Sequence, residues 1–151
     1  MTQTRTTHER LLTNGLLRLS RTYRREVDKM LAARGLSEAR ALAVLQIARL
    51  GDGVRQGVLA EALGIEGPTL VRTLDQLCAS GLVERRGDPN DKRARGLYLT
   101  GEGHAQAAVV ETILDVYRHQ LLAQIDDAAL ASVLTLFDQL EAALSATRPS
   151  E

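Results

Sequence analysis

Glycine and proline divide the middle of this 151-residue chain into two short helices joined by a tight turn. Apolar residues recur at helical spacing over residues 56–63, and Gly64 directly follows them. Pro68 opens a second amphipathic stretch, at a position where its missing N–H would be unpaired in any case. That stretch continues to about Ser80 and ends at Gly81. We therefore predict a helix-turn-helix unit in this part of the chain.

The segment after this unit changes from helical to strand-like spacing. Residues 82–86 and 96–100 are predicted to form two short strands, because residues 87–91 between them are rich in turn formers. Residues 85–95 carry five basic and two acidic side chains. A basic hairpin directly after a helix-turn-helix unit is typical of the wing of a winged helix.

The N-terminal part of the chain is helical and basic. Residues 8–34 carry one apolar stripe at helical spacing, and Ser37 is the predicted N-cap of the helix that follows. Residues 1–35 hold eight basic and three acidic side chains, a net charge of +5.

The C-terminal part is helical and acidic. Thr100 can cap a helix over residues 103–125 whose apolar residues fall on two sides, which predicts burial on two sides. A final apolar helix follows, capped by Asp126 or Asp127. Residues 101–151 hold two basic and eight acidic side chains, a net charge of −6. The two ends are therefore expected to attract each other, within one chain or between two.

The chain as a whole is neutral, so an argument for nucleic-acid binding must rest on local placement. Four side chains that can hydrogen-bond are spaced i, i+3, i+4 and i+7 along the second helix of the unit: Thr69, Arg72, Thr73 and Gln76. Donors and acceptors read the base edges of the major groove, and Arg72 could bind O6 and N7 of guanine. Such a stripe on an isolated helix is usually only its solvated face, but the basic hairpin that follows favours DNA contact. The predicted DNA-binding residues are Thr69, Arg72, Thr73, Gln76, Arg85, Lys92, Arg93 and Arg95.

Other classes of protein are disfavoured by residue usage. The single cysteine cannot form an internal disulfide, no apolar run reaches about 18 residues, and the first ten residues hold no signal-peptide core, so we expect a cytoplasmic protein without a membrane span. The cysteine and the three histidines are too scattered for a metal site. The sequence holds no nucleophile–base set and no glycine-rich phosphate loop, so we expect neither an enzyme nor a cofactor.

Two alternative functions stay open. A winged-helix module that binds protein and not DNA would carry apolar residues on the face that holds Arg72. A redox-sensing regulator would use Cys78, which lies on the inward stripe of its helix and is expected to be an inert apolar residue.

A long and specific motif runs through the unit and the hairpin. From Leu59 to Leu77 it consists of LAEALGIEGPTLVRTLDQL. It continues with Gly81-Leu82-Val83, Asp91-x-Arg93 and Leu97-x-Leu99-Thr100-x-x-Gly103. These motifs resemble the MarR family of winged helix-turn-helix transcriptional regulators, and most closely its SlyA-like branch.

The pattern and the resemblance together predict a mainly α fold with a small β hairpin. Residues 36–102 would form the winged helix-turn-helix DNA-binding lobe, and residues 8–35 together with 103–147 a helical dimerisation region. The resemblance implies a homodimer whose recognition helices enter the major groove, with Arg93 at the wing tip in the minor groove and Asp91 paired with a wing arginine. Two-fold symmetry then predicts a near-palindromic operator on double-stranded DNA, with half-sites roughly 34 Å apart.

The resemblance also implies a repressor that a small aromatic acid or phenolic ligand releases from DNA. Arg18 and Arg21 on the first helix, with Ser37 and Arg40 at the start of the second, could neutralise a carboxylate. The alternative is that these arginines are solvated or pair with acidic residues in the last helices of a partner chain. Members of this branch often carry a tryptophan where this chain has Ala41, so the identity of the ligand does not carry over.

Overall fold

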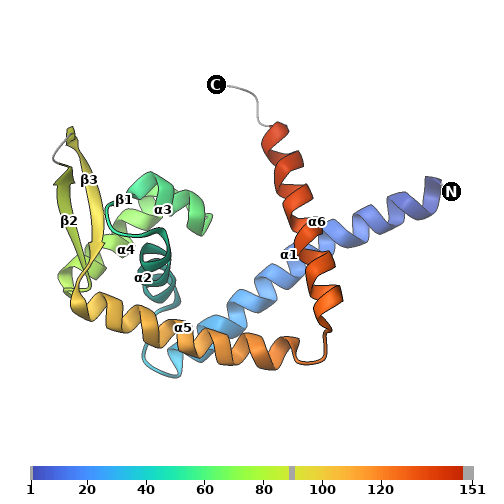
Figure 1. Cartoon of the computed structure of the whole chain (residues 1–151), viewed down its shortest axis with the longest axis horizontal. Coiled ribbons are helices and arrows are strands. Elements are labelled where there is room, and N and C mark those ends of the chain that lie inside the picture. The colour runs from blue at the N-terminus through green and yellow to red at the C-terminus, as the bar shows by residue number, and fades with distance from the viewer. Residues whose placement is uncertain (1, 89–90, 148–151) are drawn as a thin grey trace. The chain divides into compact units, whose positions relative to one another are not determined.

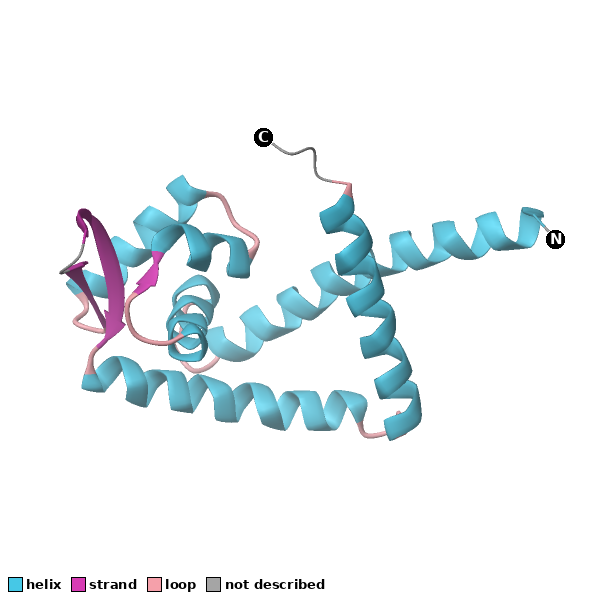
Figure 2. Ribbon diagram, turned by 45° about the horizontal axis from the view of Figure 1, so that its top comes forward, coloured by secondary structure: helices cyan, strands magenta, loops and turns pink. Residues whose placement is uncertain are grey.

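The computed structural model describes residues 2–88 and 91–147 of the chain, with side chains for residues 4–87 and 95–147. Six helices and three short strands lie within these residues (Figures 1 and 2). The helices are α1 (Thr2–Ala32), α2 (Glu38–Leu50), α3 (Gln56–Leu63), α4 (Gly67–Ala79), α5 (Gly101–Leu122) and α6 (Asp127–Ala146). The strands are β1 (Val54–Arg55), β2 (Val83–Asp88) and β3 (Asp91–Leu99).

The predicted mainly helical fold with a small hairpin is confirmed, and the sheet gains one strand beyond the prediction. Its strand order is β1-β3-β2, and both pairings are antiparallel. β1 pairs Val54 with Leu97 and Arg55 with Gly96, so it attaches the turn after α2 to the wing. A strand of two residues is too short to show the alternation of polar and apolar residues, which is why the sequence pattern did not predict it.

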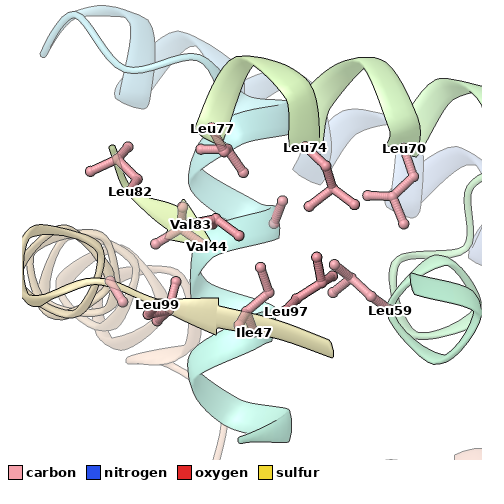
Figure 3. Close-up of a cluster of buried hydrophobic side chains, with 12 residues drawn as sticks. Val44, Ile47, Leu59, Leu70, Leu74, Leu77, Leu82, Val83, Leu97 and Leu99 are labelled. Atoms are coloured by element: carbon pink, nitrogen blue, oxygen red, sulfur yellow. The ribbon is translucent and has the colours of Figure 1, made fainter. Parts of the chain in front are cut away.

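The core of the winged-helix segment, from α2 to β3, forms where α4 packs against α2, α3 and β2, and side chains of β3 complete the cluster. Leu70, Leu74 and Leu77 of α4 are fully buried. Figure 3 shows them pointing toward a second row of side chains that includes Leu59 of α3 and Leu97 of β3. Residues spaced four and three apart lie on one side of a helix, so this packing directs the opposite side of α4 to solvent.

Thr100 joins the end of the recognition unit to the start of α5. Its hydroxyl donates a hydrogen bond to the carbonyl of Gly81 at 2.7 Å and accepts one from the N–H of Gly103 at 3.0 Å. Gly81 adopts a positive φ of 71°, a conformation that glycine reaches without steric cost. The predicted N-cap role of Thr100 is therefore confirmed, and the same side chain fixes the turn after α4.

The chain divides into two compact units, residues 1–114 and residues 115–151, with the boundary inside α5. In the second unit, Asp126 caps α6 and accepts a hydrogen bond from the N–H of Ala129 at 2.8 Å. No residue of α6 is buried, although its sequence is rich in apolar side chains. By length and composition alone α6 could cross a membrane, with a mean hydropathy of 1.2 over 18 residues, but one such helix is a weak indication.

Gly103 is a position where a single added methyl group is expected to destabilise the fold. A Cβ atom there would collide with the backbone carbonyl oxygen of Leu82, which the sheet and the turn hold in place. We expect Gly103→Ala to lower the free energy of unfolding by about 1–3 kcal/mol. Gly101→Ala, in the same first turn but with open space around it, is the matched control and should change stability by less than about 1 kcal/mol. Denaturant unfolding measures both variants, and equal stability would contradict this packing.

Candidate nucleic-acid interface

The helix α4 presents a polar face on the side opposite its buried leucines. Thr69, Arg72 and Gln76 are all exposed. Arg72 forms no ion pair or hydrogen bond with the other side chains that the structure describes. The predicted placement of these three residues on an open face is therefore confirmed, and their contact with DNA stays a prediction.

The predicted placement of Thr73 on the same open face is wrong. Thr73 is only 8% exposed, and its hydroxyl donates a hydrogen bond to the carbonyl of Thr69 at 3.3 Å. The reason is its spacing, since it stands three residues after Leu70 and four before Leu77, both of which are fully buried. Its side chain therefore belongs to the border of the core.

The open face of α4 extends instead toward the other border of the helix. Val71 is 40% exposed, and the Asp75 side chain is 58% exposed. The spacing of four residues places these two side chains on neighbouring turns of the same side. The exposed face is thus rotated away from Thr73. It includes Asp75, and it includes Val71, whose helical spacing with Leu74 and Cys78 predicts a place in the core; for Val71 that expectation is wrong.

The first arginine of the wing is tied to the recognition helix. Arg85 on β2 donates a hydrogen bond from its guanidinium to Asp75 at 2.6 Å, and its side chain is 26% exposed. Arg86 next to it pairs with Glu84 at 2.9 Å and lies over the ring of Tyr98, 4.6 Å from the ring centre. Both arginines therefore have partners within the chain.

The tip of the wing carries the remaining basic residues. Arg95 is exposed on β3, opposite Gly87 of β2. The side chains of Asp91, Lys92 and Arg93 lie outside those that the structure describes. The predicted pairing of Asp91 and the predicted minor-groove role of Arg93 therefore stay predictions.

The two ends of α4 differ in how they are held. At its start, the side chain of the N-cap residue Glu66 makes no hydrogen bond to the first turn, which leaves backbone N–H groups without a side-chain acceptor. At its end, the guanidinium of Arg40 donates to the hydroxyl of Ser80 at 2.9 Å, and that hydroxyl donates to the carbonyl of Gln76. The free N–H groups and the positive end of the helix dipole suit a phosphate, while α2 fixes the far end.

The four predicted ligand-binding residues are not brought into one contact network among the described residues. Arg18 and Arg21 are exposed and line a shallow depression on α1 beside Gly15. Ser37 is exposed at the N-cap of α2 without a side-chain capping bond. Arg40 is half-buried and bound to Ser80, with its Nε atom buried and without a hydrogen-bond partner.

Cys78, the candidate redox residue, is half-buried and packs against the core of the winged-helix segment, in keeping with its place on the inward stripe of α4.

One acidic side chain on α1 has a shifted pKa. The hydrogen bond that Lys29 donates to Glu26 lowers the pKa of that carboxyl group. This exposed ion pair lies outside the candidate interface.

Known proteins share both the sequence pattern and the fold. Residues 34–94 match the sequence model of the MarR family. The transcriptional regulator PA3341 is 36% identical over 89% of this chain and 98% of its own, with a TM-score of 0.82. The MepR–DNA complex of Staphylococcus aureus is 22% identical over 85% of this chain and 94% of its own, with a TM-score of 0.73. MarR of Staphylococcus aureus, in complex with salicylate and kanamycin, is 20% identical over 93% of this chain and 94% of its own, with a TM-score of 0.78.

At 22% and 20% identity, the last two structures show only that the fold is shared. The family match from α2 into the wing, together with 36% identity over most of the chain, shows more: this chain belongs to the MarR family of winged-helix transcriptional regulators.

Proposed function

We propose that the protein is a sequence-specific DNA-binding transcriptional regulator that places α4 in the major groove. The observation that carries this proposal is the amphipathic placement of α4: three fully buried leucines on one side, and the open side chains of Thr69, Arg72 and Gln76 on the other. A helix that is held by one face leaves its other face free to hydrogen-bond with base edges. The complex of MepR with DNA, which has the same fold, supports this assignment.

The wing supplies the contacts outside the major groove. In this proposal Lys92, Arg93 and Arg95 approach the backbone and the minor groove, whose narrow stretches attract arginine. Arg85 acts on DNA through its pair with Asp75, which holds the wing against α4. A winged helix that binds only protein would need an apolar α4 face, and the long open side chains of α4 include Arg72, Asp75 and Gln76.

The regulator works as a homodimer in this account. The described part of the chain leaves large apolar side chains of three helices exposed to solvent, which would be costly in a monomer. They include Leu11, Leu12, Leu17 and Leu19 of α1, Val109, Val116 and Leu121 of α5, and Val133, Leu134, Phe137 and Leu144 of α6. In a dimer, the apolar side chains of a second copy would pack against these residues, and its basic N-terminal and acidic C-terminal parts would attract the oppositely charged parts of the first copy. The dimer would recognise a near-palindromic operator, as a cytoplasmic repressor of the SlyA-like branch.

A small aromatic or phenolic acid is proposed to release the repressor from DNA. The structure of a MarR protein with salicylate supports this class of ligand. The candidate groups are Arg18, Arg21, Ser37 and Arg40, and Arg40 connects α2 directly to the C-terminal end of α4. A ligand can shift the protein only if it binds the DNA-competent and the DNA-incompetent dimer with different affinity.

The major-groove and minor-groove contacts are distinguished by two alanine variants. Arg72→Ala should relax the preference for one base pair in each half-site, with a loss of about 1–3 kcal/mol against the preferred sequence. Arg93→Ala should weaken binding to all sequences and reduce the slope of log affinity against log salt by about one per chain. Fluorescence anisotropy with duplexes selected from a random pool measures both effects. Parent-like binding by both variants would contradict the proposed contacts.

The dimer is tested on the exposed apolar stripe of α6. Leu134→Lys places a charge on this stripe and should shift the protein from dimer to monomer in sedimentation experiments at micromolar concentration, with loss of operator binding. Gln139→Lys, on the opposite side of α6, adds the same charge and is expected to leave the dimer intact. A monomeric parent protein, or a dimeric Leu134→Lys variant, would contradict the assignment of this surface.

Salicylate provides the probe for ligand control. We expect millimolar salicylate to weaken operator binding by the parent protein at constant ionic strength. Arg40→Gln should reduce this response while the protein still binds operator. Sodium acetate and sodium chloride serve as controls for charge and salt, and an operator affinity that salicylate leaves unchanged would argue against release by aromatic acids.

A further inference from the structure

Val71 is an aliphatic residue on the open face of α4 that lies outside the hydrophobic core. Val71 is 40% exposed, whereas Leu70, Leu74 and Leu77 of the same helix are fully buried. Valine is also a weaker helix former than alanine, so the local helix does not require it. The side chain is therefore free to contact something outside the chain.

The surroundings of Val71 restrict what that contact can be. It precedes the open guanidinium of Arg72 and stands one turn before the Asp75–Arg85 ion pair. A charged rim of this kind around a single isopropyl group is a poor docking surface for an apolar protein partner. It is suited to a small apolar group set among hydrogen-bonding groups.

The major groove contains one such group on the four bases, the C5 methyl of thymine. Val71 lies in the N-terminal half of a 13-residue helix, the half from which recognition helices reach base edges. Val71 and Arg72 are both exposed on the open face of α4, so with this face in the major groove they would meet different, neighbouring base pairs.

We infer that Val71 is a specificity-determining residue that contacts the methyl group of one thymine in each half-site, beside the base pair that Arg72 contacts. This inference rests on the proposed function, in which α4 enters the major groove. It assigns the protein a preference for a thymine that polar contacts alone do not explain.

The experiment removes the methyl group from DNA and the isopropyl group from the protein in a double-mutant cycle. Each thymine of a selected operator is replaced in turn, symmetrically in both half-sites, by deoxyuridine, which lacks only the methyl group. For the parent, one such replacement should weaken binding about fourfold per half-site, the equivalent of one buried methyl group at about 0.8 kcal/mol. For Val71→Ala, the same replacement should leave the affinity unchanged.

The control variant is Val58→Ala on α3, which removes an aliphatic side chain that is 49% exposed but does not lie on α4. It should keep the full deoxyuridine effect. Thermal unfolding verifies that both variants are folded. A parent that binds the operator but responds to no deoxyuridine, or a Val71→Ala variant with the parent's response, overturns the inference and leaves the proposed function standing. A parent that binds no duplex overturns both.

Discussion

The burial of one row of leucines on α4 is the interaction on which the rest of the structure depends. Leu70, Leu74 and Leu77 are fully buried in a cluster with side chains of α2, α3 and the sheet (Figure 3). Each such side chain contributes roughly 1.5–3 kcal/mol of hydrophobic stabilisation. The exposed ion pair between Asp75 and Arg85 contributes at most about 1 kcal/mol. The core therefore sets the rotation of α4 about its axis, and with it the residues that face outward, while the ion pair only holds the wing beside the helix.

Features that depend on local spacing could be predicted from the sequence. The glycines and Pro68 mark the ends of α3 and α4, and the hydroxyl of Thr100 and the carboxylate of Asp126 cap the helices that follow them. The orientation of Thr73 could not be predicted from local spacing. A threonine at the border of an apolar stripe is polar by composition, and only the packing of its helix decides that it turns inward while Val71, at the other border, stays open.

Contacts between distant segments could not be predicted in the same way. β1 has two residues, and it exists because Val54 and Arg55 meet β3 more than forty positions later. The sequence of the wing contains five basic side chains, but two of them have partners within the chain. Arg85 pairs with Asp75, and Arg86 pairs with Glu84 and lies over the ring of Tyr98. The positive charge of Arg85 and Arg86 is therefore partly neutralised within the chain, which the composition of the wing does not show.

The central claim, that α4 reads the major groove, is tested most directly by guanine methylation interference on a selected operator. Methylation at guanine N7 places a methyl group in the major groove at the atom that an arginine would bind. We expect methylation to block binding at guanines in two clusters, separated by about one helical turn of DNA. An operator that binds equally well with every guanine methylated would contradict major-groove contact by α4.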